Sequence, residues 1–158
     1  MSNQDRDAYY LSLPKRRAGS GALLTDLAGR ILVVEPRYKA TWEIPGGIVE
    51  AGEDPRTTCR RECMEELGLD IVPGRLLAIE HKTENPPHGD SIMFVYDGGT
   101  LGDDVPIHLP DAELRRYQFV AADDLDQYLS PRLANRLRQA RHARATGSTI
   151  ELVNGIVS

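Results

Sequence analysis

The sequence predicts an α/β fold in which a mixed β-sheet lies between helices, an α/β/α sandwich. Short apolar runs typical of strands come before, between and after longer helical segments, so helices are expected to cover both faces of the sheet. The length of 158 residues suits one domain, and an apolar fraction of 41% provides for a core and argues against disorder.

Three strands are predicted before the first long helix. Ala22–Thr25 and Ile31–Glu35 are apolar runs joined by a polar, glycine-containing turn at 26–29, as in a hairpin. Thr41–Ile44 is predicted as a short third strand. The segment Pro45-Gly46-Gly47 is expected to end it as a turn, because proline and glycine interrupt regular structure.

A helix is predicted over Pro55–Leu67. Asp54 is a good N-cap, proline fits the first helical position, and Gly68 fits the C-terminal stop. An apolar stripe at spacing i, i+4, i+8 is expected to pack against the sheet. The two cysteines in this stripe are expected to be reduced thiols, since a disulfide across one helical turn has poor geometry. The stripe consists of Cys59, Cys63 and Leu67.

Three further strands and two helices are predicted in the second half. The strands are Arg75–Glu80, Ser91–Tyr96 and Tyr117–Val120, and the second of them is apolar enough to predict burial on both faces. The helices are Ala122–Leu129 and Pro131–Ala145. The basic side of the last helix is interpreted as a solvated face rather than a nucleic-acid patch. Its members are Arg132, Arg136, Arg138, Arg141 and Arg144.

The predicted organisation is one domain at 20–146 with a segment at each end. Residues 1–19 are expected to be a mobile arm or a strand that docks elsewhere, and 147–158 a tail that docks as a strand; these ends also offer surfaces for a homodimer.

The start lacks a secretory apolar stretch and no run is long enough to span a membrane, so a cytoplasmic protein is expected. A net charge of −5 disfavours binding to nucleic-acid polymers or anionic membranes.

Three glutamates of the predicted helix carry the chemistry. Glu62, Glu65 and Glu66 are three and four residues apart, so they share one helical face, where like charges repel each other. Gly46–Gly47 and a further acid, Glu53, lie just upstream. Carboxylate and carbonyl oxygens are the ligands that Mg²⁺ and Mn²⁺ prefer, so the pattern indicates a site for hard divalent cations beside a phosphate.

The spacing from Gly47 to Leu69 reads G-x5-E-x7-R-E-U-x-E-E-x-G-U, where U is apolar. This resembles the box of the Nudix hydrolase superfamily at all seven fixed letters, with Cys63 and Leu69 in the apolar slots. The resemblance implies a Nudix-type α/β/α sandwich.

The resemblance also assigns roles to residues. It implies that Glu62, Glu65 and Glu66 bind metal together with the Gly46 carbonyl, that Arg61 holds a glutamate by a charged hydrogen bond, and that Glu53 is a supporting acid that steadies the loop before the helix. The general base is either Glu62 or an acid outside the box. The outside candidates are Glu84, Asp90, Asp103, Asp104 and Glu113.

The implied activity is hydrolysis of a diphosphate linkage, dependent on Mg²⁺ or Mn²⁺, in a nucleotide-type small molecule. Nucleoside triphosphates, nucleotide sugars, ADP-ribose and dinucleotides all remain open. Arg37 and Lys39 are candidates for binding substrate phosphate or ribose. Two other hypotheses are a nucleotide-sensing module without turnover and a structural protein whose acidic helix is incidental.

Overall fold

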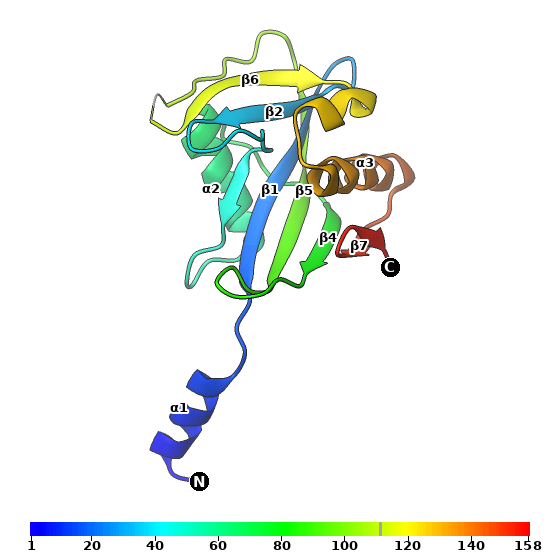
Figure 1. The fold of residues 1–158 in the computed structure, drawn as a ribbon. Helices are drawn as coiled ribbons and strands as arrows, with labels where there is room; N and C mark the ends of the chain where they lie inside the picture. The colour runs from blue at the N-terminus through cyan, green and yellow to red at the C-terminus, as the bar shows by residue number, and fades with distance from the viewer. Residues whose placement is uncertain (111) are drawn as a thin grey trace.

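The computed structural model describes residues 1–110 and 112–158, and Figure 1 shows its helices and strands. The described residues form one eight-stranded sheet with helices on both faces, which confirms the predicted α/β/α class. In chain order the elements are α1 (Asn3–Ser12), β1 (Arg17–Asp26), β2 (Ile31–Pro36), β3 (Gly46–Ile48), α2 (Pro55–Leu67), β4 (Leu76–Lys82), β5 (Ser91–Leu101), β6 (Leu114–Val120), the 3₁₀ helix η1 (Ala122–Gln127), α3 (Pro131–Thr146), β7 (Ile150–Val153) and β8 (Ile156–Val157).

The sheet is mixed, with strand order β6-β2-β1-β5-β4-β7-β8, and β3 pairs with β1 outside this path. Strand β1 is parallel to β5, and β4 is parallel to β7, while the other pairs are antiparallel. One edge of β1 is shared, because β2 pairs near its end at Thr25 and β3 pairs near its start at 19–21. The central strand therefore positions β3 and the segment that follows it.

Alternate residues of β1 point into two hydrophobic cores, one on each face of the sheet. Leu23 lies in the core under α3 and η1, together with Val95 and Leu137. Leu24 lies in the core under α2, which contains the three residues of the predicted stripe. All three stripe residues are fully buried and both cysteines are free thiols, as predicted: Cys59, Cys63 and Leu67.

Helix α2 has the predicted bounds because its end signals are local. The Asp54 side chain accepts a hydrogen bond from the Thr57 N–H at 2.9 Å, and Pro55 opens the helix. Gly68 ends it in the left-handed conformation, with φ of +67°, which glycine adopts without steric cost. These caps fix which residues form the helical face that carries the glutamates.

The predicted strand at Thr41–Ile44 is wrong. Only Glu43 forms an isolated bridge there, with Val34, and the third strand is instead Gly46–Ile48. The glycines extend beside β1 rather than turning, because Gly46 lies opposite Gly21 and two backbones without side chains can approach closely. This pairing joins residues far apart in the sequence, which the local glycine signal did not reveal.

The chain ends differ from the expectations in detail. Residues 3–12 form helix α1, which extends away from the sheet in Figure 1 and buries no side chain, and the central strand already begins at Arg17. The tail forms the hairpin β7–β8, and β7 adds to the sheet beside β4. The segment 122–127 is a 3₁₀ helix, shorter than the α-helix predicted to residue 129. None of the described helices has the length and apolar character needed to cross a bilayer.

Two predictions about burial are also wrong. Strand β5 is only half-buried over Ile92–Phe94, because Met93 and Phe94 border a cavity. The basic side of α3 is not a uniformly solvated face. Arg136 is buried against Glu80, and Arg144 hydrogen-bonds to Thr25 and contacts Asp97.

The close contact between β1 and β3 predicts that Gly46→Ala destabilises the fold. A Cβ atom at this position would lie 2.5 Å from the Ser20 carbonyl oxygen and 2.7 Å from the Gly21 Cα, and neither backbone atom can move aside freely. We expect a loss of about 2 kcal/mol or more in the free energy of unfolding, measured by urea denaturation. Gly102→Ala is the matched control, because its Cβ would meet only a flexible Asp104 carboxylate oxygen; equal losses in both variants would contradict the argument.

Candidate active site

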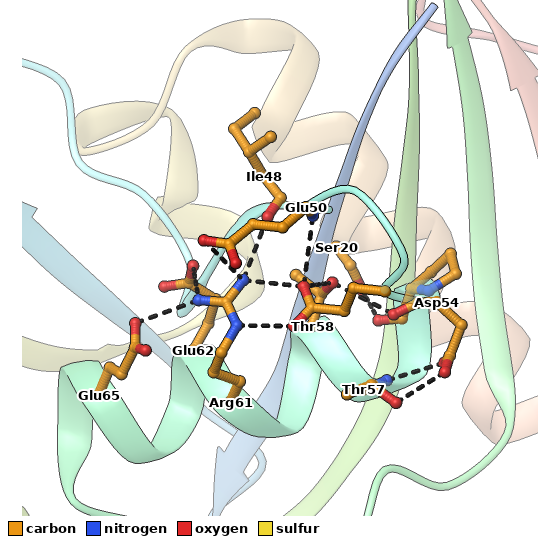
Figure 2. Close-up of polar contacts among 11 residues, drawn as sticks. Ser20, Ile48, Glu50, Asp54, Thr57, Thr58, Arg61, Glu62 and Glu65 are labelled. Carbon is orange, nitrogen blue, oxygen red and sulfur yellow. Dashed lines mark hydrogen bonds and ion pairs between the residues drawn. The ribbon is translucent and has the colours of Figure 1, made fainter.

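Arg61 is the centre of the polar network on α2 (Figure 2). Its Nε and Nη2 atoms donate to the two carboxylate oxygens of Glu53 at 2.8 and 2.9 Å, a bidentate pair. Its Nη1 atom donates to Glu62 at 2.9 Å and to Glu65 at 3.2 Å. The helix and the preceding loop thus place three predicted site acids around one guanidinium, which is held most closely by Glu53.

Glu53 ties the loop before α2 to the first turns of the helix. Besides the Arg61 pair, it accepts a hydrogen bond from the Thr58 hydroxyl, and its N–H donates to the Glu50 carbonyl at 3.0 Å. The hydrogen bonds from Arg61 and then Thr58 lower the pKa of Glu53 from 4.5 to about 2, because they stabilise its charged form. The side chain is therefore a fixed anion that orients Arg61.

Glu62 lies directly against the backbone of Gly47. A Cβ atom at position 47 would collide with the Glu62 carboxylate, so glycine is required there for the carboxylate to reach β3. Partial burial raises the pKa of Glu62, and this effect outweighs the hydrogen bond and charge of Arg61, which lower it. The arrangement brings the partly desolvated Glu62 carboxylate to the backbone of β3 at Gly47.

Glu66 is the most buried of the three helical acids, with 9% of its surface exposed. Its Oε2 atom accepts a hydrogen bond from the Gly46 N–H at 3.1 Å. Burial raises the pKa of Glu66 to about 8, and the negative charges of Glu62, Glu113 and Glu65 add to the rise. A nearby cation would strongly stabilise the charged form of a carboxylate in this position.

The carboxylate oxygens of Glu62, Glu65 and Glu66 are suitable ligands for a hard divalent cation, although their present partners are protein groups. Among the residues that the structure describes, no three acidic, histidine or cysteine side chains already surround a common point. Arg61 holds Glu62 and Glu65, and the Gly46 N–H holds Glu66, so a cation would compete with these groups. Three carboxylates on adjacent turns, beside the two glycines that open β3, still offer the oxygen ligands that Mg²⁺ or Mn²⁺ prefers.

A cavity of about 270 Å³ opens beside these groups. Gly46, Gly47 and Glu66 line it, as do apolar side chains of both sheet faces and two residues that the sequence analysis did not assign to the site, Tyr38 and Arg136. Although 77% of the surface of Tyr38 is exposed, partial desolvation and then the charges of Glu66, Glu113 and Glu62 raise its pKa. Neither residue belongs to a local motif, so no sequence signal pointed to them.

The structure separates the five acids proposed as bases outside the box. Glu113, in the turn before β6, is close enough that its charge raises the pKa values of both Glu62 and Glu66. The others lie elsewhere: Glu84 is paired with His88, Asp90 with Arg16, and Asp103 borders a separate cavity beside the Asp26 turn, next to Asp104.

The two candidate substrate-binding cations do not line the cavity. The Arg37 N–H donates to the Glu113 carbonyl at 2.8 Å, and Lys39 forms an ion pair with Glu43. Tyr38, between them in the sequence, does line the cavity, as do Glu43 and Ile44 further along the same segment. The segment between β2 and β3 therefore borders the cavity through residues other than these two cations.

The lowered pKa of Glu53 predicts a pH-dependent contribution to stability. Its ion pair stabilises the fold in full above its ordinary pKa of 4.5, and this contribution is lost as the pH falls towards about 2. Glu53→Gln should therefore lower the free energy of unfolding more at about pH 6 than at about pH 3. Urea titrations of both proteins at the two pH values test this, and an equal difference at both would contradict it.

Comparisons with known proteins agree with this architecture. A family model described as "NUDIX domain" matches residues 15–142. The chain is 33% identical over 113 residues to an ADP-ribose pyrophosphatase of Methanocaldococcus jannaschii, covering 66% of each chain. It is 38% identical over 79 residues to nucleoside diphosphate-linked moiety X motif 6 of Xenopus laevis, covering 48% of this chain but only 36% of that protein's length.

A solved structure shares the fold. The MutT protein of Methanosarcina mazei superposes with a TM-score of 0.69 at 23% identity, covering 84% of this chain and 99% of that one. At this identity the likeness concerns the fold alone. The family model, by contrast, extends over most of the chain and includes the acidic helix, the glycine strand and most of α3. The chain therefore belongs to the NUDIX domain family.

Proposed function

We propose that this protein is a divalent-metal-dependent hydrolase that cleaves the diphosphate linkage of a nucleoside diphosphate derivative. The observation that carries the proposal is the position of Glu66 and Gly46–Gly47 on the wall of a cavity, beside the Glu62 and Glu65 carboxylates. The names of the relatives support the substrate class, since one is an ADP-ribose pyrophosphatase and the name of another refers to a nucleoside diphosphate-linked moiety. The family and the fold leave the individual substrate open.

The proposed roles follow from the contacts. Glu62, Glu65, Glu66 and the Gly46 carbonyl would hold Mg²⁺ or Mn²⁺, which would neutralise charge on the diphosphate and activate water. Glu53 fixes Arg61 by two hydrogen bonds, and Arg61 in turn orients Glu62 and Glu65. The buried helix stripe keeps these side chains on a rigid element rather than a loop.

Two acids are candidates for the base that takes a proton from water. Glu62 accepts a hydrogen bond from Arg61, but its burial outweighs this bond and leaves its pKa raised, which favours uptake of a proton. Glu113 is exposed and comes from a different segment, and its negative charge raises the pKa values of Glu62 and Glu66. We propose Glu113 as the outside candidate for this role, with Glu62 as its rival.

The main alternative is a module that binds a nucleotide without turnover. A panel of nucleoside triphosphates, nucleotide sugars, ADP-ribose and dinucleotides, incubated with Mg²⁺ or Mn²⁺ and analysed for products, separates the two. Metal-dependent release of a nucleoside monophosphate or diphosphate supports hydrolysis and locates the bond that is cut. Saturable binding without product in either metal favours the sensing module.

Removing the helical carboxylates should abolish turnover while the fold persists. We expect Glu62→Gln and Glu66→Gln each to lower kcat/KM by about 100-fold or more, because each removes a charge that holds the metal at the reacting phosphate. Steady-state kinetics on the best substrate of the panel gives the values. Asp70→Asn is the matched control, because Asp70 is an exposed acid just beyond the end of α2 and pairs with Arg60 of that helix. A loss of similar size in this control would contradict the assignment.

Metal binding should stabilise the protein through the same acids. A ligand that binds only the folded state raises the free energy of unfolding by an amount set by its concentration relative to Kd. Mn²⁺ should therefore raise Tm in the wild-type protein and much less in Glu66→Gln, with chelator reversing the change. An equal Mn²⁺ effect in both proteins would show that the ion binds elsewhere, and an incidental acidic helix predicts no effect at all.

A further inference from the structure

Arg136 of α3 is a buried arginine on the wall of the cavity. Only 9% of its surface is exposed, and its Nε donates to the Oε1 atom of Glu80 at 2.7 Å. Glu66 on α2 also lines the cavity, and α2 and α3 cover opposite faces of the sheet in Figure 1. The cavity therefore receives a carboxylate from one face and a guanidinium from the other.

Most of the hydrogen-bonding capacity of this guanidinium is unused. Arginine has five N–H donors, and within residues 1–110 and 112–158 the two terminal nitrogens of Arg136 have no hydrogen-bond partner. These nitrogens are not fully enclosed, because Glu80 Oε2 and Ser91 Oγ are the buried side-chain atoms of the described residues without a partner, so water can reach the nitrogens from the cavity. A ligand in the cavity that carries acceptor atoms would replace that water.

The surrounding charges favour an oxygen acceptor. Glu80 is fully buried and lies between two arginines, because Arg132 approaches its second oxygen at 3.8 Å. That second oxygen has no hydrogen bond. One carboxylate facing two guanidinium groups leaves a net positive charge, which attracts carbonyl oxygens and repels amino groups that bear partial positive charge.

The other walls of the cavity suit a flat ring. Ile44, Val95 and Leu133 present aliphatic carbon, and Met93 presents a polarisable thioether that packs well against aromatic systems. A sugar would leave its hydroxyl groups unpaired against these side chains. A nucleobase instead covers the apolar walls with its faces and presents polar atoms only at its edge.

We propose that Arg136 determines base specificity: its terminal nitrogens donate to the ring carbonyl of an oxo base such as uracil or hypoxanthine, so such bases are favoured over their amino counterparts. The inference rests on the proposed function, since it takes the occupant of the cavity to be the base of the nucleoside diphosphate. Arginine suits this role because its guanidinium only donates hydrogen bonds, so it pairs with a carbonyl oxygen and not with an amino group.

Matched nucleotide pairs test the proposal in the wild-type protein. UDP and CDP differ in the oxo or amino group at one ring position and in whether the adjacent ring nitrogen carries a proton, and so do IDP and ADP. Calorimetric titration in the presence of Mg²⁺ should give a Kd for UDP lower than that for CDP by roughly 10-fold or more, and likewise for IDP against ADP. Equal affinities within both pairs, or no binding of any of the four, would overturn the inference.

A variant pair separates the role of Arg136 from that of the ion pair. Removing Arg136 alone strands the buried Glu80 charge and endangers folding, so the double variant Glu80→Met with Arg136→Met replaces both with apolar side chains of similar size. It should bind both members of each pair within about 3-fold. Arg132→Met, beside the same carboxylate but away from the cavity wall, should keep the preference.

Persistence of the oxo preference in the double variant would overturn the inference, as would its loss in Arg132→Met. If the double variant does not fold, the wild-type comparison decides. The outcome is separable from that of the proposed function. Oxo-selective binding without hydrolysis of any diphosphate derivative would sink the function and keep the inference, whereas hydrolysis with equal affinities would do the reverse.

Discussion

The site depends on a close approach between two backbones that leave no room for side chains. Gly46 and Gly21 lie opposite each other where β3 meets β1, and a Cβ on either would collide with the other strand. The neighbouring Gly47 leaves the space into which the Glu62 carboxylate extends from α2. Because one strand makes both contacts, the position of the acidic helix and the shape of the cavity wall are set together.

Beside Gly46–Gly47, the acids outnumber the cationic groups that pair with them. One guanidinium, Arg61, faces the acids of the helix and its preceding loop. Its bidentate pair of hydrogen bonds goes to Glu53. Glu65 receives only a shared hydrogen bond, and Glu66 receives a neutral backbone N–H. The resulting repulsion adds to burial in raising the pKa of Glu66 to about 8. The protein tolerates a local destabilisation that a bound cation would relieve, as expected where a site is built for function rather than for stability.

The parts of this structure that follow from local sequence were predictable. Helix α2 begins and ends where Asp54, Pro55 and Gly68 indicate. Strand β3 was misplaced because its pairing with β1 joins distant segments, and a diglycine reads locally as a turn. Arg136 was interpreted as a solvated residue because the spacing along α3 does not reveal Glu80 on a strand more than fifty residues away. The burial of a charge depends on its partner, and the partner is fixed by the tertiary fold.

The same distinction explains why the acidic motif leaves the substrate open. The motif lies on the loop and helix of one sheet face, and it supplies the groups suited to a diphosphate, which all candidate substrates contain. The remaining cavity walls include β5, the loop at Tyr38 and α3, together with parts of β1, β2 and β6, segments without a recognisable functional pattern. Selectivity requires contacts that differ between substrates, and only these walls can reach the groups that differ. In the proposal made above, the group on those walls that meets this part of the substrate is the Arg136 guanidinium, so α3 would set the preferred polarity there and the acidic helix would not.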